Sequence, residues 1–397
     1  MPLNSNKLGL PGWLILMGAL TAIGPVSIDM YLPAFPSIAT GLNATHSQVE
    51  RTLAIYLIGM SVAQLAYGPL ADRYGRKPPL YGALSLYIVA SAGCAIAPNI
   101  EVLTASRLLQ AMGGAAGMVI SRAVVRDHYD TQEAARALSM LMLIMGVAPI
   151  LAPLIGGQVL ALTGWRGIFV LITVSAIILL WTVSRVMVES LRPDRVIPLS
   201  WSSILHNYSQ LIRNGKFVAF AMSGAMGSAT MFGYIVSSPR LFIDYYGISS
   251  QSYGLLFGLN ALCLITGSQV SARMLKKYRP VQLLPWALRA MMLAGLSALG
   301  LTLSGSVTLT ILMGCMMAFM FCQGFVGPNS AAMALSEQGN RLGSASALLG
   351  TFTIASGACA GFLVSLASET GPLPMALILG GCTTLSWLIG GIARRRP

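Results

Sequence analysis

The chain has 397 residues, of which 55% are hydrophobic and only 9% are charged, and its formal net charge is +13. Its mean hydropathy of +0.72 excludes a soluble globular protein of this length. The composition predicts a protein that spans a membrane many times.

Apolar runs of roughly 20 residues recur along the whole chain, each long enough to cross a hydrocarbon core about 30 Å thick as a helix. The first run is about twice as long as the apolar part of a signal peptide, so we expect a retained helix. The runs predict twelve transmembrane helices, at 13–36, 50–71, 79–97, 102–125, 136–160, 166–185, 217–240, 251–273, 282–303, 307–330, 343–367 and 373–393.

The longest polar interval between runs separates the first six from the last six. It is basic and contains Trp201, which is typical of a segment lying on the cytoplasmic membrane surface. We therefore expect an all-α protein with a six-helix bundle at 1–185, an amphipathic linker at 186–216 and a second six-helix bundle at 217–397.

The basic residues follow the alternating topology. Loops on one side carry most of them, whereas the opposite loops carry little beyond Arg51, Arg166 and Arg240. This positive-inside bias predicts that both termini lie in the cytoplasm. It accounts for the net charge through contact with an anionic lipid leaflet, so no nucleic-acid partner is expected.

Metal ligands are scattered rather than clustered. The three histidines lie outside the apolar runs, and the six cysteines lie inside them without CxxC spacing. We expect no metal and no cofactor.

Asp29 is the only acidic residue that lies well within a predicted span. A charge at mid-membrane costs roughly 2.5 to 3.5 kcal/mol on insertion scales, so such residues are functional by default. Arg107 lies at a similar depth on the fourth span, which runs in the opposite direction, so the two side chains can pair. The alternative is a fixed structural ion pair.

Several motifs resemble a known family. The loop GPLADRYGRKP, 68–78, read alone is a basic loop with a helix cap, but it resembles the cytoplasmic loop signature of the major facilitator superfamily. LTASRLLQAMGGAAG, 103–117, is similar to that family's R-x-x-Q-G motif, with Ala111 in place of glycine. GVAPILAPLIGG, 146–157, resembles the antiporter motif of drug exporters, with Ala152 in place of glycine.

The most specific likeness runs through nearly the whole chain. SIDMYLPAFPSIA, LAIYLIGMSVAQLAYGPLADRYGRKP, MFGYIVSSP and SALLGTF resemble the bicyclomycin and chloramphenicol/florfenicol exporters of the Bcr/CflA subfamily. The resemblance implies a drug:proton antiporter of the bacterial inner membrane that works by alternating access. The expected partners are a small drug-like molecule, protons and the lipid bilayer, with the proton gradient as the energy source, and we expect a monomer.

The resemblance also implies site residues. Asp29 and Arg107 would couple proton movement to transport. In the superfamily, a charge network at the cytoplasmic ends of the helices latches the outward-facing state, and here Asp72, Arg76 and Asp127 match it. The residues expected to act in conformational gating are Gly68, Asp72, Arg73, Gly75, Arg76, Asp127, Pro153, Gly156 and Gly157.

Polar, aromatic and methionine side chains within the spans are candidates for the substrate cavity. Methionine and aromatic side chains suit a cavity that adapts to several ligands, although ordinary packing is the alternative for the apolar candidates. An amide in lipid needs a polar partner. The candidates are Tyr31, Tyr56, Gln64, Gln110, Met226, Phe232, Tyr234, Asn260, Phe321, Gln323 and Asn329.

The sequence supports two other functions to different degrees. A membrane enzyme needs a nucleophile with its base, paired carboxylates or a metal, and the sequence contains no GxSxG, HExxH or Walker A motif. A dedicated exporter or importer of a metabolite, such as an amino acid or sugar, stays open. The near absence of buried charge in the second half of the chain favours loosely specified, largely apolar substrates.

Overall fold

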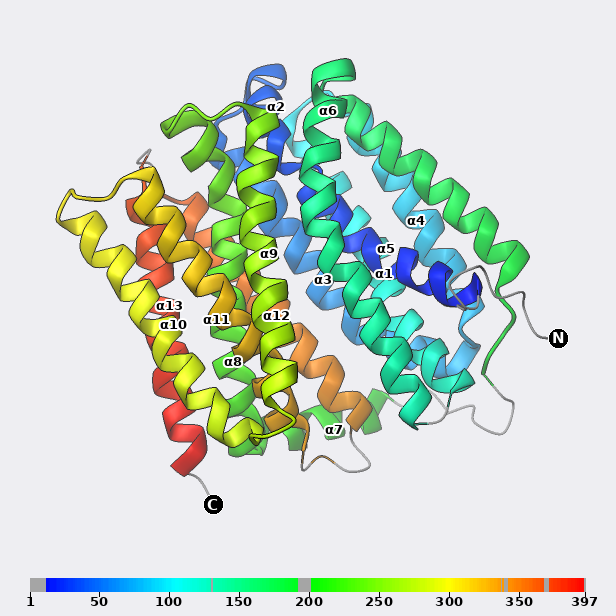
Figure 1. Cartoon of the computed structure of the whole chain (residues 1–397). Helices are drawn as coiled ribbons and strands as arrows, with labels where there is room; N and C mark the ends of the chain where they lie inside the picture. The colour runs from blue at the N-terminus through cyan, green and yellow to red at the C-terminus, as the bar shows by residue number, and fades with distance from the viewer. Residues whose placement is uncertain are drawn as a thin grey trace. The chain divides into compact units, whose positions relative to one another are not determined.

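The computed structural model describes residues 12–129, 131–191, 201–336, 338, 342–367 and 371–395. Within these ranges the regular structure is helical and no strand is formed. The helices, coloured along the chain in Figure 1, are α1 (Gly12–Asp29), η1 (Leu32–Ala34), α2 (Phe35–Gly41), α3 (His46–Tyr74), α4 (Lys77–Ala95), α5 (Ile100–His128), α6 (Thr131–Val186), α7 (Trp201–Arg213), α8 (Gly215–Pro239), η3 (Arg240–Tyr245), α9 (Ser250–Met274), α10 (Pro280–Leu303), α11 (Leu309–Leu335), α12 (Leu342–Ser365) and α13 (Leu373–Arg395).

The twelve predicted spans match these helices. Eleven segments of the described chain are long and apolar enough to cross a membrane, and one of them, Ile144–Val186, has 43 residues. At 1.5 Å per residue that is roughly 65 Å, about twice a hydrocarbon core. Gly164 breaks the segment with a φ of 75° and a ψ of 179°, a left-handed φ that glycine adopts without steric cost. The fifth and sixth predicted spans therefore lie on either side of Gly164.

The helices group into two compact units. Unit 1 comprises residues up to Ala44 and from Gly59 to Leu199, and unit 2 comprises Thr45–Ile58 and Ser200–Pro397. The helix α3 is therefore shared, because its first turns belong to unit 2 and the rest belongs to unit 1. The predicted boundaries at 185 and 216 stay a prediction, and residues 192–200 of the expected linker lie outside the described ranges.

In unit 1, α5 packs against both α1 and α4, and α6 packs against both of those helices in turn. Two glycines of α5 allow the close approach. A Cβ at Gly113 would lie 2.6 Å from the carbonyl oxygen of Ala83 on α4, and a Cβ at Gly117 would overlap the carbonyl of Leu20 on α1. Small residues at such crossings let helix backbones touch.

In unit 2, α8 packs against α11, α12 and α13, while α10 lies against α11 and α13, and α9 lies against α11. Gly324 on α11 serves the last of these crossings, since a Cβ there would lie 2.5 Å from the carbonyl oxygen of Leu264. The short helix α7 lies within the segment expected to form the linker, and it packs against α8 and α12.

Candidate functional site

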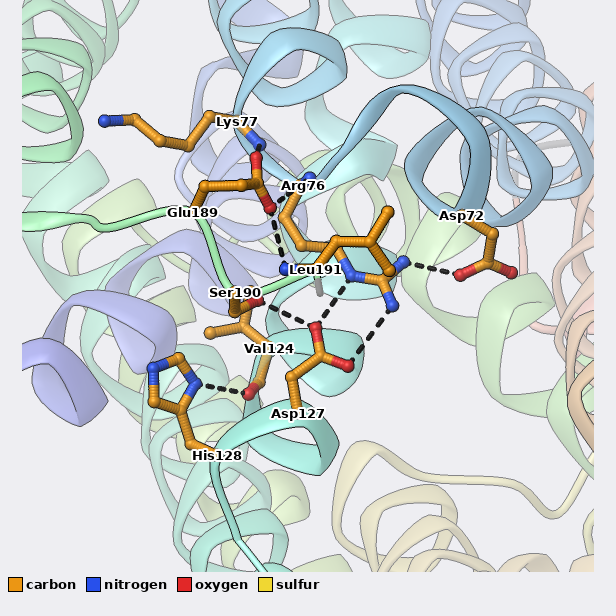
Figure 2. Close-up of polar contacts among 9 residues, drawn as sticks. All are labelled: Asp72, Arg76, Lys77, Val124, Asp127, His128, Glu189, Ser190 and Leu191. Atoms are coloured by element: carbon orange, nitrogen blue, oxygen red, sulfur yellow. Dashed lines mark hydrogen bonds and ion pairs between the residues drawn. The ribbon is translucent and has the colours of Figure 1, made fainter. Parts of the chain in front are cut away.

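Arg76 holds a charge cluster where α3 ends and α4 begins, shown in Figure 2. Its Nε donates to Oδ2 of Asp127 at 2.9 Å, and its Nη2 donates to Oδ1 of the same carboxylate at 3.3 Å. Its Nη1 donates to Oδ1 of Asp72 at 2.5 Å. The two-point contact with Asp127 uses the fork geometry of the guanidinium, and it joins α5 to the loop between α3 and α4.

The Arg76–Asp127 pair is largely shielded from solvent, with side-chain exposures of 7% and 11%, whereas the side chain of Asp72 is 43% exposed. Burial alone would lower the pKa of Arg76, but the hydrogen bonds and negative charges of Asp127 and Asp72 raise it above its usual value. Arg76 is therefore a permanent cation, and its hold on the two carboxylates depends on geometry and on their ionisation.

Glu189, just after α6, binds the start of α4. Its carboxylate accepts the backbone N–H of Arg76 at 2.9 Å and that of Lys77 at 3.0 Å. These are donors that the first turn of a helix leaves without intrahelical partners. Partial burial raises the pKa of Glu189, but the backbone donors of Arg76, Leu191, Lys77 and Ser190 outweigh it and hold the pKa below its usual value.

Ser190 completes the link, because its hydroxyl donates to Oδ2 of Asp127 at 2.7 Å. Gly75 leaves room for this segment: its φ of 93° lies in the left-handed region, and a Cβ there would come within 2.6 Å of Oε2 of Glu189. The structure thus brings Asp72, Gly75, Arg76 and Asp127 together.

Two other residues predicted for gating lie apart from these contacts. Arg73 is exposed in the last turn of α3. Gly68 has open space where a Cβ would lie, so packing does not require glycine there. The gating role of all these residues stays a prediction.

Asp29 ends α1 and is only 3% exposed, while Arg107 on α5 is fully buried. Arg107 Nη1 donates to the carbonyl oxygen of Ser27 at 3.0 Å and to Oε1 of Gln110 at 2.7 Å. Its guanidinium carbon lies 4.4 Å from the ring centroid of Tyr31. Whether Arg107 also pairs with Asp29 stays a prediction. Through Ser27 the arginine binds the C-terminal end of α1, where the helix dipole favours a cation.

The predicted antiporter motif packs on the same end of α1. A Cβ at Gly156 would overlap the carbonyl oxygen of Met30, the residue after Asp29. Pro153 and Gly157 are buried beside it in sequence on α6. The motif therefore bears on the position of Asp29 through backbone packing.

The cavity candidates of unit 1 are already held by protein contacts. Gln110 is fully buried, and its side-chain Nε2 donates a hydrogen bond to Oγ of Ser91 at 2.8 Å. Gln64, 5% exposed, donates to Sδ of Met118 at 3.7 Å. The ring of Tyr31 lies against the guanidinium of Arg107, as described above.

In the three amide side chains of unit 2, the nitrogen donates a hydrogen bond, whereas the oxygen accepts none from the described residues. The amide N–H groups of Asn260, Gln323 and Asn329 donate to Tyr234 at 3.1 Å, Ser228 at 3.4 Å and Ser271 at 2.9 Å, respectively. The amide oxygens of these three residues are buried and accept no hydrogen bond within the described part of the chain.

The remaining candidates differ in burial. Tyr56 is fully buried in the first half of α3, in unit 2. Met226, Phe232 and Phe321 are half-buried. Whether any of these side chains contacts a substrate stays a prediction.

The sequence analysis missed Glu189 and Ser190, because it treated the whole polar interval after the sixth span as linker. The signal was an acid followed by a hydroxyl residue directly after the last apolar turn.

The sequence analysis also placed Glu50 at the edge of a span. The helix α3 begins four residues earlier than predicted, at His46, so Glu50 is inside the helix and fully buried.

The chain belongs to the Major Facilitator Superfamily, whose sequence profile it matches over residues 17–362. It is thus a multi-pass membrane transporter and not an enzyme. It is 34% identical to the "Uncharacterized MFS-type transporter YdgK" of Bacillus subtilis, over 95% of this chain and 93% of that protein.

A second relative is the "Bicyclomycin resistance protein homolog" of Haemophilus influenzae, which is 27% identical over 95% of this chain and 94% of that protein. In fold, the chain resembles the xylose transporter XylE from E. coli, with a TM-score of 0.74 at 13% identity, over 97% of both chains. This likeness concerns the fold alone.

Proposed function

We propose that this protein exports small drug-like molecules across the bacterial inner membrane in exchange for protons, by alternating access. The observation that carries the proposal is the buried carboxylate of Asp29, 3% exposed at the end of an apolar helix. A buried carboxyl group is stable as a neutral acid or beside a cation, and changes in solvent access shift the balance between the two forms.

The polar groups of unit 2 support a drug-like substrate. Three buried amide oxygens, on Asn260, Gln323 and Asn329, accept no hydrogen bond from the described residues. Buried acceptors without partners are costly, and a ligand carrying hydroxyl or amide donors would satisfy them. Relatives named for resistance to bicyclomycin and to chloramphenicol are consistent with such substrates.

The test is drug-evoked proton movement in everted membrane vesicles that hold a respiratory pH gradient. Bicyclomycin, chloramphenicol, florfenicol and tetracycline are added in turn while a pH-sensitive dye reports the lumen. Antiport predicts that a substrate discharges the gradient through the native protein and that Asp29→Asn abolishes the response. Glu101→Gln is the matched control, since Glu101 is an exposed acid in the first turn of α5.

A full response in Asp29→Asn would place coupling elsewhere. Silence of the native protein across the whole panel would contradict drug export and favour a carrier dedicated to one metabolite.

A further inference from the structure

A second group of ionisable side chains lies in unit 2, away from Asp29. It joins the first turns of α3 to η3, which continues from the end of α8. Nδ1 of His46 lies 3.0 Å from Oδ2 of Asp244. Nη1 of Arg240 lies 3.9 Å from Oε2 of Glu50. The mechanism proposed above uses none of these four residues.

Glu50 is the unusual member of this group. It is 0% exposed, yet neither of its carboxylate oxygens accepts a hydrogen bond from any residue that the structure describes. Its ion pair with Arg240, at 3.9 Å, is longer than a charge-assisted hydrogen bond, while Arg240 donates to the carbonyl oxygen of Ala367 at 2.9 Å. A buried anion held so weakly carries much of its desolvation cost uncompensated.

The Glu50 carboxyl group lines a small cavity. The cavity has about 10 Å³ of water-accessible space, and its wall is formed by Glu50, Ser237, Arg240, Leu241, Val364, Gly371, Pro374 and Met375. That is about the space that one water molecule needs. A water molecule there would bring a proton to a carboxyl group that is otherwise sealed.

Among the residues that the structure describes, few charges lie around Glu50. On α3 itself they are His46 and Arg51, and on η3 they are Arg240 and Asp244, which lie four residues apart. The walls contributed by α12 and the start of α13 within the described ranges are apolar or backbone. Arg240 acts electrostatically on both carboxylates, so two acids share this arginine.

We propose that Glu50 is a second proton-binding site of this protein. A proton from bulk solvent is relayed through the cavity water, which takes up one proton as it gives one on, to the Glu50 carboxylate. Glu50 becomes a neutral acid, and Arg240 keeps its electrostatic interaction with Asp244. Loss of the negative charge removes the Glu50–Arg240 attraction and leaves the His46–Asp244 contact as a polar link between the start of α3 and η3. The six residues Arg240–Tyr245 form a π-helix, a geometry frequent at functional sites.

The role in transport rests on the proposed proton exchange, but the binding of a proton does not. The experiment is therefore infrared difference spectroscopy of the purified full chain in lipid, titrated with pH, reading the C=O stretch of protonated carboxylic acids. The variants are Glu50→Gln, Glu50→Asp and Asp29→Asn, with Glu101→Gln as the exposed control.

The proposal predicts that Glu50→Gln loses one titrating component of the carboxylic acid band. Asp29→Asn and Glu101→Gln keep that component, and Glu50→Asp keeps a shifted one, which shows that the site still folds. A band identical to the native one at every pH in Glu50→Gln would overturn the proposal, because Glu50 would then not change its protonation state.

Failure of antiport gives a different pattern. If no drug discharges the pH gradient of the vesicles while the Glu50 component of the infrared band titrates, the proton site at Glu50 is supported and drug:proton exchange is contradicted. If Glu50→Gln abolishes transport with no change in the infrared band, Glu50 serves only to maintain the structure, and the proposal of a proton site there is wrong.

Discussion

Arg76 shows how one side chain can organise a site. Its three guanidinium nitrogens donate to the carboxylates of Asp127 and Asp72 at the same time, which a lysine's single ammonium group cannot match in geometry. The neighbouring Glu189 binds backbone N–H groups at the start of α4 and at Ser190 and Leu191. Two carboxylates therefore hold the segment after α6, Glu189 through backbone donors and Asp127 through the hydroxyl of Ser190.

The substitution Glu189→Gln should destabilise the protein at neutral pH by about 1 kcal/mol, the typical cost of losing an N-terminal helix cap. The pKa of Glu189 is held below its usual value of about 4.5. A depressed pKa contributes stability above the unfolded-state pKa, and that contribution is lost as the pH falls through the folded-state pKa.

Thermal unfolding of native protein and Glu189→Gln should therefore differ most near neutral pH and converge below about pH 4.5. Glu101→Gln serves as the control, with its exposed glutamate in the first turn of α5. A difference that stays constant with pH would show that the cap does not depend on the charge.

At the scale of helices, the crossings in unit 1 depend on the absence of side chains. Gly113→Ala should lower the melting temperature, because the added Cβ would lie 2.6 Å from the carbonyl oxygen of Ala83 and the nitrogen of Tyr87. Overpacking of this kind costs about 1–3 kcal/mol.

Gly82→Ala on α4 is the matched control, since nothing lies within 4 Å of a Cβ there. Alanine's higher helix propensity should leave that variant as stable as the native protein or slightly more stable. Equal losses in both variants would mean that the α4–α5 crossing relaxes to accept the methyl group.

The helices were predictable because hydropathy reports membrane spans almost directly. The fifth and sixth spans were predicted as separate helices, and α6 is broken between them at Gly164, whose backbone is not helical. The start of α3 was misplaced because His46, Ser47, Gln48 and Glu50 are polar, and hydropathy cannot tell a buried polar turn from an exposed one.

The contacts of the sites were less accessible to sequence reasoning. The resemblance supplied Asp72, Arg76 and Asp127, and the structure joins them. No local pattern showed that Glu189, more than a hundred residues after Arg76, would cap α4. The expected link between Arg107 and Asp29 was argued from depth alone and stays a prediction. Depth does not show that the arginine also donates to the carbonyl oxygen of Ser27.

For the whole molecule, the distribution of Lys and Arg predicts both termini in the cytoplasm. A green fluorescent protein fused after Pro397 should therefore fluoresce, and alkaline phosphatase fused at the same point should be inactive. Phosphatase inserted beside Gly305, in the exposed loop between α10 and α11, should be active. The reverse pattern would mean that the chain is inserted the other way.

The helix α5 has 29 residues, or about 43 Å of rigid rod. It carries Arg107 near one end and Asp127 near the other, and its glycines seat it directly against the backbones of α1 and α4. A small rotation of such a rod moves both of its ends together. A change in the contacts of Arg107 that rotates α5 would thus also move Asp127 relative to Arg76, without a relay of side chains between the two sites.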